Sequence, residues 1–420
     1  MPADVDGLIQ YLAASPSPYH AVAEAAARLD TAGWTRLDMR NAWDDTPSRC
    51  YVAVGGALIA WHQPAARLAH GGFRIVGAHT DSPNLRIKPK PDTGSVGWRQ
   101  LGVEIYGGVL LNSWLDRDLG LSGRVVTRNG TQPLRVDEPL ARVPQLAIHL
   151  DRDVNERGVQ LDKQQHMTPI WGLGATSEGD FAHWVADRLS VVATEIVSWD
   201  LMLHDLTPPA LLGSQQELLA SARLDNLVSC WSALVALLSC EPTDGVTPVV
   251  CLFDHEEVGS ESATGAAGPL LTAVLERLTK STTDGAAFRR SMAASVCVSS
   301  DMAHAVHPNY PERHEPAHRP LPNAGPVIKV NANQRYATDA ESHALFVRAC
   351  EAAGVPWQVF VSKNSQPCGS TIGPITATRL GIPTVDVGCA QLSMHSAREL
   401  CGTQDPTMLS SALKTFMQNA

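Results

Sequence analysis

Apolar runs of strand length along the chain lead into acidic residues. Residues 249–253 are entirely apolar and are followed, after two polar positions, by Glu256 and Glu257. Residues 295–300 lead in a similar way to Asp301. Continuous apolar runs are typical of buried strands in a largely parallel sheet, and the carboxyl ends of such strands form the binding crevice of α/β proteins. We therefore predict an α/β fold whose chemistry lies at these strand ends.

Helical spacing predicts helices that cover this sheet. Apolar residues recur three and four positions apart over residues 224–238, with Asp225 and Asn226 in the first turn. Residues 6–34 are expected to form two helices, separated by the Ser-Pro-Ser-Pro sequence at 15–18. The other elements predicted for this domain are strands over 51–61, 72–78, 357–361 and 384–388 and a helix over 270–278.

Between residues 88 and 208 the pattern changes to short strands and turns. Strands are predicted over 101–106, 121–127 and 133–136, and Asn129-Gly130 is a hairpin signature between the last two. We therefore predict a discontinuous α/β domain, residues 1–87 and 209–420, with a mixed central sheet and flanking helices. Residues 88–208 are predicted to form an inserted, mostly β domain.

Composition narrows the range of partners. The chain has 420 residues, enough for two domains, and a net charge of −10, which disfavours nucleic acid and anionic membranes as partners. No segment is long and apolar enough to span a membrane, and the acidic start at residues 1–6 is unlike a secretion signal, so we expect a cytosolic protein. The nine cysteines include no Cys-x-x-Cys pair and are expected to be reduced, buried thiols.

The polar residues at strand ends and at one helix start form a candidate metal site. His79 and Asp81 follow the 72–78 strand and lie two apart, which in extended chain puts them on one face, where a carboxylate can orient a metal-binding imidazole. Taken singly, each candidate also has a structural explanation, such as a solvated turn or a helix-start acid. The complete set is His79, Asp81, Asp225, Glu256, Glu257, Asp301 and His395.

Two imidazoles and several carboxylates without a thiolate are the ligand set of a paired divalent-metal hydrolytic site. Zinc is the first expectation, and manganese or cobalt are alternatives. In such a site one carboxylate is shared by the two cations, and a bridging water loses its proton near neutral pH. Glu256, next to a presumed ligand, is the candidate to take that proton and pass it to the leaving group.

Several longer sequence blocks resemble those of the M18 family of metallo-aminopeptidases, the aspartyl aminopeptidases. The resemblance spans nearly the whole chain, and together the blocks are highly specific. They are Gly-Ala-His-Thr-Asp-Ser-Pro at 77–83, Ser-Ala-Arg-Leu-Asp-Asn-Leu at 221–227, Phe-Asp-His-Glu-Glu-Val-Gly at 253–259, Ser-Ser-Asp-Met-Ala-His-Ala-Val-His-Pro at 299–308, Lys-Val-Asn-Ala-Asn-Gln-Arg-Tyr at 329–336 and Met-His-Ser at 394–396.

The resemblance implies a role for each candidate residue. His79 would bind one metal ion and His395 the other, with Asp225 bridging the two. Glu257 and Asp301 would complete the ligand shells. Asp81 would orient His79, and Glu256 would act as general base and then as general acid. The implied activity is removal of the N-terminal residue from peptides with a free N-terminus.

The resemblance also implies a substrate preference and an assembly. Lys329, with Tyr336 and His304 nearby, would recognise an N-terminal aspartate or glutamate. The inserted domain would mediate subunit contacts, and His166 would reach a neighbouring subunit's site as an oxyanion donor. Relatives assemble from dimers into a tetrahedral dodecamer. Two alternatives stay open: an N-acyl amino-acid deacylase that uses the same metal pair without recognising an amine, and a non-catalytic scaffold on a degenerate peptidase fold.

Overall fold

The computed structural model describes residues 4–64, 72–243, 245–279 and 286–419. Residues 1–3, part of the acidic start noted above, lie outside the described residues. The chain divides into two compact units. The first unit comprises Met1–Asp81, Pro209–Met394 and Glu399–Ala420, and the second comprises Ser82–Pro208 and His395–Arg398.

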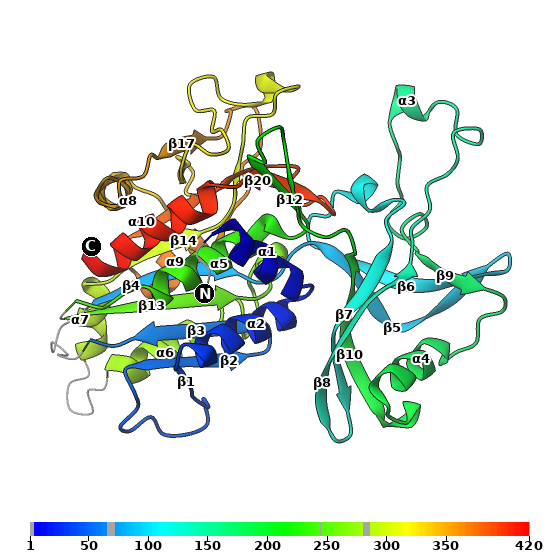
Figure 1. Ribbon diagram of the computed structural model, residues 1–420, viewed down its shortest axis with the longest axis horizontal. Helices are drawn as coiled ribbons and strands as arrows, with labels where there is room; N and C mark the ends of the chain where they lie inside the picture. Colours follow the sequence, from blue (N-terminus) through cyan, green and yellow to red (C-terminus); the bar gives the residue numbers. More distant parts are fainter. Residues whose placement is uncertain (1–3, 65–71, 244, 280–285, 420) are drawn as a thin grey trace. The chain divides into compact units, whose positions relative to one another are not determined.

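The first unit is built on a mixed nine-stranded sheet (Figure 1). β13 (Val246–Phe253) pairs in parallel with β4 (Gly72–His79) and antiparallel with β3 (Ala57–His62). Its presence confirms the α/β prediction and the strands expected from the apolar runs. The remaining strands of this sheet are β1 (Thr35–Arg36), β2 (Arg49–Val54), β14 (Val296–Ser300), β16 (Val327–Val330), β17 (Gln358–Val361) and β18 (Thr384–Gly388).

The prediction of one strand over residues 51–61 is wrong. The segment forms the antiparallel pair β2 and β3, joined by a two-residue turn at Gly55 and Gly56. Gly55 has a φ of +59°, a left-handed conformation that glycine adopts without the steric cost of a Cβ atom. The apolar character of both strands conceals the turn, because almost every side chain from Cys50 to Trp61 on either side of it is buried.

Helices cover both faces of this sheet (Figure 1). Alternate strand residues belong to two separate cores, as expected when side chains of a strand point to opposite faces. One core packs under α1 (Val5–Ala14), α2 (Pro18–Thr31), α5 (Leu224–Leu238), α8 (Ala340–Ala353) and α10 (Asp405–Asn419). The other packs under α6 (Leu270–Thr279), α7 (Ala287–Ala293) and α9 (Ile372–Leu380). The predicted helices over 6–34, 224–238 and 270–278 are therefore confirmed.

A smaller sheet of five strands completes the first unit. Its strands are β11 (Ala210–Leu212), β12 (Leu218–Ser221), β20 (Glu399–Gly402), β19 (Ala390–Leu392) and β15 (Ala303–His304), in that order. β15 begins two residues after Asp301, so the chain passes from one of the candidate strand ends directly into this smaller sheet.

The second unit is a six-stranded antiparallel sheet with helices added. The Asn129-Gly130 hairpin is confirmed, because Thr127 pairs with Gly130 across the turn. The expectation of strands and turns throughout 88–208 misses α4 (Asp180–Leu189), whose buried Phe181 and Val185 lie four residues apart, and the short α3 (Val154–Arg157). The strands, in sheet order, are β8 (Gly130–Ala141), β7 (Leu119–Thr127), β10 (Ile196–Asp205), β5 (Asn84–Ser95), β6 (Trp98–Tyr106) and β9 (Ile170–Leu173).

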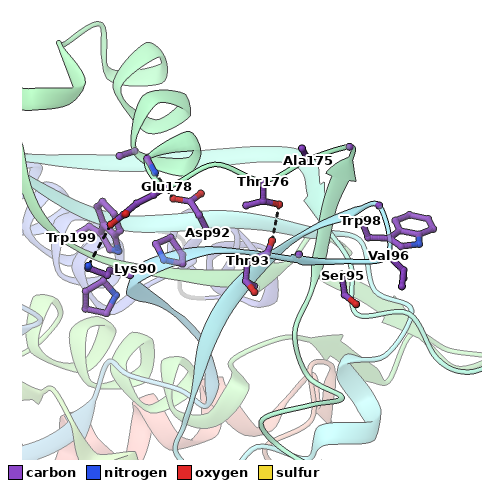
Figure 2. A pocket seen from close by; sticks show the side chains of 17 residues that line it. Lys90, Asp92, Thr93, Ser95, Val96, Trp98, Ala175, Thr176, Glu178 and Trp199 are labelled. Carbon is purple, nitrogen blue, oxygen red and sulfur yellow. Dashed lines mark hydrogen bonds and ion pairs between the residues drawn. The ribbon is translucent and has the colours of Figure 1, made fainter.

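A cavity of about 1070 Å³ lies in the second unit, between the β5–β6 hairpin and the start of α4 (Figure 2). Lys90 and Glu178 form an ion pair across 3.4 Å at its rim, with side chains 88% and 84% exposed. Among the described residues that line it there is none of the candidate site residues. The chemistry predicted from the sequence therefore has to be sought elsewhere.

Two expectations from composition can be compared with the structure. In the part of the chain that the structure describes, no helix combines the length and apolarity needed to cross a bilayer. The nine cysteines are free thiols in the part of the chain that the structure describes, and all except Cys368 are buried, as the apolar runs around several of them predicted.

Candidate active site

The carboxyl ends of three neighbouring strands bring the candidate residues of the first unit together. β4 and β13 run in parallel with His79 opposite Phe253, so the chain beyond Phe253 starts beside His79. β14 runs in parallel on the other side of β4 and ends next to Asp301. The sequence-based expectation that these strand ends meet at one edge is confirmed for these three strands.

A sharp bend after β13 allows both glutamates to face this edge. His255 has a φ of +64°, and Glu256–Val258 form a single 3-10 turn. Adjacent residues of an extended strand would point in opposite directions, whereas in the turn the backbone N–H groups of Glu256 and Glu257 both donate to Asp81, to Oδ1 and Oδ2, each across 3.1 Å. The Asp81 carboxylate therefore fixes the turn that carries both glutamates.

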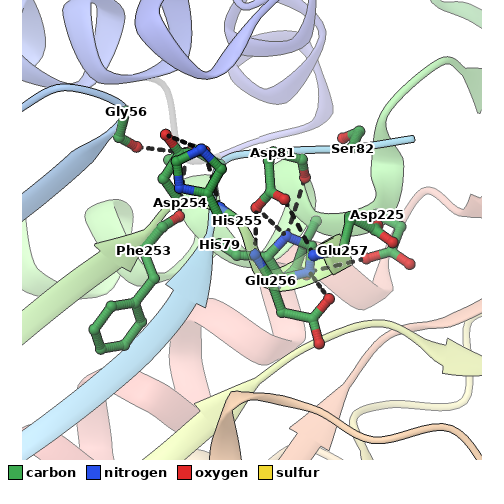
Figure 3. A network of polar contacts seen from close by, with 12 residues as sticks. Gly56, His79, Asp81, Ser82, Asp225, Phe253, Asp254, His255, Glu256 and Glu257 are labelled. Atoms are coloured by element: carbon green, nitrogen blue, oxygen red, sulfur yellow. Dashed lines mark hydrogen bonds and ion pairs between the residues drawn. The ribbon is translucent and has the colours of Figure 1, made fainter. Parts of the chain in front are cut away.

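His79 is the buried centre of the polar network (Figure 3). Its side chain is 1% exposed, and Nδ1 lies 3.0 Å from the carbonyl oxygen and 3.3 Å from Oδ1 of Asp81. A carbonyl oxygen can only accept, so Nδ1 carries a proton, as it does in an imidazole that binds a metal ion through Nε2. Nε2 lies 3.4 Å from Asp225 Oδ1, 3.6 Å from Asp301 Oδ1 and 3.9 Å from Glu256 Oε2.

Asp225 stands at the first residues of α5 without helical geometry. Asp225 and Asn226 both have non-helical backbone angles, and the peptide bond between them is cis. The backbone N–H of Asp225 donates to Glu399 Oε2 across 2.9 Å, and Asn226 Nδ2 donates to the carbonyl oxygen of Ser300 across 2.8 Å. A helix-start acid that serves only the macrodipole does not account for these contacts.

The ionisation of the two central groups is strongly perturbed. Burial opposes a charge on His79, but hydrogen bonds to Asp225, Asp301 and Asp81 outweigh it and raise the pKa of His79 well above its ordinary value. Burial raises the pKa of Glu256 to about 8, although the charge of His79 acts in the opposite direction. Shifts of this kind cluster at functional sites.

The donor atoms fit a divalent metal ion. His79, Asp225 and Asp301, all buried, offer three ligand atoms within 4.8 Å of one another, and so do His79, Glu256 and Glu257. Imidazole nitrogen and carboxylate oxygen without thiolate suit zinc, and also manganese or cobalt. The chemistry of this donor set therefore agrees with the metal site predicted from the sequence.

Two predicted site histidines belong to the second unit. His395 has a φ of +67°, and its Nδ1 lies 3.0 Å from the carbonyl oxygen of Gly108, so Nδ1 carries a proton as in His79. His166 is exposed, and its Nδ1 accepts the backbone N–H of Asp162 across 2.9 Å. Metal binding by His395 and action of His166 in a neighbouring subunit stay predictions.

The three residues expected to recognise the substrate side chain lie on and beside β15 and β16. Lys329 is 2% exposed, so it is not the surface lysine that a strand start often carries. Its Nζ lies 3.4 Å from Asp301 Oδ2, donates to the carbonyl oxygen of Met302 across 3.2 Å and lies 5.2 Å from the ring centre of Tyr336. The exposed ring of His304 packs against Phe360, which also contacts Tyr336.

Sequence reasoning missed Glu399 as a member of this site. Glu399 is 2% exposed and fixes the backbone of Asp225. A signal was present, since Glu399 lies only four residues beyond His395. Its contact with Asp225 joins residues 174 positions apart, however, and so depends on the tertiary fold.

Comparison with known proteins agrees with this geometry. The family model described as "Aminopeptidase I zinc metalloprotease (M18)" matches residues 11–417. The chain belongs to the M18 aminopeptidase family. This M18 chain is therefore an aminopeptidase of a zinc metalloprotease family, a hydrolase that acts on peptides, as predicted from the sequence blocks.

Relatives and solved structures extend over almost the full length of the M18 chain. It is 55% identical to the "Probable M18 family aminopeptidase 2" of Streptomyces coelicolor over 98% of this chain and 97% of the relative. It is 49% identical to the Mycobacterium leprae protein of the same name, with 99% of each chain covered.

Two solved structures share the fold. A cryo-EM structure of the Ape4 and Nbr1 complex superposes with a TM-score of 0.95 at 36% identity, covering 99% of this chain and 86% of that chain. The S. cerevisiae mApe1 dodecamer superposes with a TM-score of 0.85 at 28% identity, covering 98% and 95%.

Proposed function

We propose that this M18 aminopeptidase removes N-terminal aspartate and glutamate residues from peptides with a free N-terminus, using two divalent metal ions and Glu256 as the proton carrier. One observation supports this most directly: the buried His79 Nε2 lies within 4 Å of carboxylates from three separate elements, one of which is Glu256. Such a cluster of like charges is unfavourable in a protein interior unless cations compensate it.

The metal ions would be held by His79, Asp225, Glu257, Asp301 and His395, with Asp225 shared between them. Zinc is expected first, and manganese or cobalt are alternatives. When bound, the pair polarises the carbonyl of the scissile peptide bond and lowers the pKa of the attacking water.

The chain's own residues would supply proton transfer and orientation. Glu256 takes the proton of the attacking water and gives it to the amine that leaves, a task for which a buried carboxylate with a raised pKa is suited. Asp81 holds His79 through Nδ1 and, by binding both backbone N–H groups of the turn, holds Glu256 and Glu257 in their positions. A carboxylate among the ligands would accept the free amino group of the substrate.

Preference for an acidic N-terminal residue would come from Lys329. The protein as a whole is acidic and repels acidic peptides at long range, so recognition requires a local cation. The buried ammonium of Lys329 lies where the effective dielectric constant is low, and one ion pair there is worth more than one in water. Tyr336 and His304 would form the remainder of this side-chain subsite.

The second unit would mediate contacts between subunits. This is the role that the family resemblance implies for the inserted domain, residues 88–208. Its segment 144–150 is exposed, with Leu146, Ile148 and Leu150 at 57%, 46% and 75%, and apolar surface of this kind favours a protein partner. We propose dimers that assemble into a tetrahedral dodecamer, with His166 acting as oxyanion donor in a neighbouring subunit. The mApe1 relative is a dodecamer. A cytosolic location is proposed from the reduced thiols.

A panel of amino-acid anilides tests the reaction. Aspartyl, glutamyl and leucyl anilides are assayed before and after chelation, and again after individual metals are restored. We expect loss of turnover on chelation, recovery with zinc, and the highest kcat/KM for the acidic residues. Blocking the amino group should abolish hydrolysis; faster cleavage of blocked substrates would instead identify a deacylase. Lys329→Met should reduce turnover of acidic substrates selectively, and an equal loss on the leucyl substrate contradicts the proposed role of Lys329.

A further inference from the structure

One fully buried carboxylate next to the proposed side-chain subsite has no part in the mechanism above. Asp386 lies in β18, is 0% exposed, and accepts three hydrogen bonds. Ser299 Oγ and Thr371 Oγ1 donate to Oδ1 across 2.6 and 2.5 Å, and the backbone N–H of Ala337 donates to Oδ2 across 2.6 Å. A buried carboxylate is costly, and burial raises the pKa of Asp386 above its ordinary value.

Two of the three donors come from segments that also carry proposed site residues. Ser299 lies two residues before Asp301 on β14, and Ala337 follows Tyr336 directly. Thr371 is the N-cap of α9. Asp386 therefore joins the strand that ends at a proposed metal ligand to the segment that carries an aromatic wall of the subsite.

Asp386 is also the cross-strand partner of Lys329. β16 and β18 are antiparallel, and Lys329 lies directly opposite Asp386. Side chains of directly opposed residues stand on the same face of a sheet, with Cβ atoms about 5 Å apart. The two charges act on each other, because the ammonium of Lys329 favours ionised Asp386 and thereby partly offsets the burial that raises the pKa of this carboxyl. Lys329 thus has two acidic neighbours, Asp301 at 3.4 Å and Asp386 across the strand pair.

The surroundings of Asp386 leave no room for a different arrangement. A Cβ atom on Gly373, in the first turn of α9, would lie 2.3 Å from Asp386 Oδ2 and 2.5 Å from Oδ1. The carboxylate consequently packs directly against the start of the helix, where only glycine allows this approach. This packing and the three hydrogen bonds together hold the Asp386 carboxylate in place.

We propose that Asp386 is a positioning residue of the side-chain subsite whose negative charge limits the attraction of Lys329 for an acidic substrate side chain. This inference rests on the proposed recognition of acidic residues by Lys329. With Asp301 and Asp386 both beside one ammonium, the local charge is already negative before a substrate carboxylate arrives. Removing the charge of Asp386 while keeping its shape should strengthen, and not weaken, the preference for acidic residues.

The test compares kcat/KM for aspartyl and leucyl anilides at about pH 8, well to the alkaline side of the ordinary carboxyl range, because burial raises the pKa of Asp386 and ionisation needs a higher pH. In Asp386→Asn we expect the ratio of aspartyl to leucyl kcat/KM to rise by about tenfold, mainly through a lower KM for the aspartyl substrate. Asp405→Asn is the matched control. Asp405 is a buried carboxylate too, but its hydrogen-bond partners are the backbone N–H groups of Asn323 and Gly325, so this variant should lose thermal stability without changing the ratio.

Ser299→Ala provides a second measurement that does not depend on the folding of Asp386→Asn. It removes a hydrogen bond that favours the ionised carboxylate, so Asp386 carries less negative charge and the ratio should rise, as in Asp386→Asn, by about threefold. An unchanged ratio in either folded variant, with only a lower Tm, overturns the inference and leaves Asp386 a structural residue.

Wild type and Lys329→Met separate this outcome from failure of the proposed function. The proposed function fails if wild type shows no preference for the aspartyl anilide. It also fails if Lys329→Met lowers kcat/KM equally for the aspartyl and leucyl anilides. If wild type prefers the aspartyl anilide and Lys329→Met removes that preference, an unchanged ratio in Asp386→Asn counts against Asp386 alone.

Discussion

The two units of the chain place their chemically important side chains in opposite surroundings. In the first unit His79 and Lys329 are 1% and 2% exposed, and each contacts several other polar groups of that unit. In the second unit His166 is exposed, and residues 144–150 present apolar side chains to the surface. Buried polar groups need partners within their own fold, whereas exposed apolar groups favour a partner from outside it. We infer that the first unit holds its buried polar groups in place through its own contacts, whereas the second unit presents a surface suited to a protein partner.

The strongest test of the first unit is Glu256→Gln. The amide cannot carry the proton, so kcat should fall by about 10³-fold or more, while the neighbouring ligands keep their positions and zinc content is retained. Anilide turnover and metal analysis measure both. Glu261→Gln, an exposed glutamate in the loop that follows, should leave turnover unchanged. Substantial activity in Glu256→Gln would remove this residue from the acid–base role.

His166→Ala tests whether the second unit contributes across a subunit contact. Loss of an oxyanion donor should lower kcat by about 10²-fold without loss of zinc. Co-expression with the Glu256→Gln chain is the decisive measurement. Assemblies that contain both inactive chains should regain part of the activity, because an intact Glu256 site can then receive His166 from its neighbour. Failure to regain activity in proven mixed assemblies contradicts action in trans.

Asp81→Asn tests how far the first unit depends on a single buried carboxylate. The substitution keeps the shape but exchanges one acceptor for a donor facing a backbone N–H, which should lower the free energy of unfolding by about 1–3 kcal/mol. Zinc affinity should fall by about 10- to 100-fold, because His79 loses its orienting partner. Chelator competition and thermal unfolding measure the two effects. Unchanged zinc affinity would limit Asp81 to a structural role.

Leu146→Ser combined with Leu150→Ser tests the exposed segment of the second unit. The assembly should shift toward smaller species in sedimentation velocity, since apolar area is removed from the proposed contact. Stability of the subunit itself should change by no more than about 0.5 kcal/mol, because both side chains are exposed. Val192→Ser, at a position of the same unit that is 63% exposed, is the control and should leave the assembly intact. An unaltered assembly in the double variant would place the contact elsewhere.

The smallest expected effect is a difference in reactivity among the cysteine thiols of the first unit. Burial raises the pKa of Cys50 to about 11 and that of Cys350 to about 12, so both remain protonated at about pH 8 and react only as the pH rises toward those values. Half-buried Cys368 is accessible to reagents. Iodoacetamide followed by peptide mapping should label Cys368 first in the native protein. Rapid labelling of Cys50 would indicate that this sheet opens readily.

Much of the first unit could be predicted from apolar pattern because its strands and helices follow their characteristic periods. The strand ends that carry His79 and Asp301 were found in this way, and the long helix beginning near Asp225 as well. The bend at His255 could not be found, because a non-glycine residue with positive φ has no local signature. The turn at Gly55 was hidden by apolar residues on both sides.

The contacts that complete the site join residues far apart in the sequence, so they could not be predicted from local patterns. Glu399 and Asp386 act on residues far away in sequence. Asp386 nevertheless left a trace, since a lone acid within the apolar strand Thr384–Gly388 must find partners when that strand is buried. Less could be predicted for the side chains of the second unit. Their proposed partner is a second copy of the chain, and the sequence of one chain does not show which of its surfaces meet in an assembly.

The burial of Lys329 has a practical consequence for handling the enzyme. Amine-reactive supports and acylating dyes attach to lysines that reach solvent, such as Lys90, whose side chain is 88% exposed. The ammonium of Lys329 is 2% exposed and contacts Asp301, Met302 and Tyr336, so it should react with such reagents far more slowly than Lys90. Immobilisation through amines should therefore preserve the substrate selectivity of the bound enzyme.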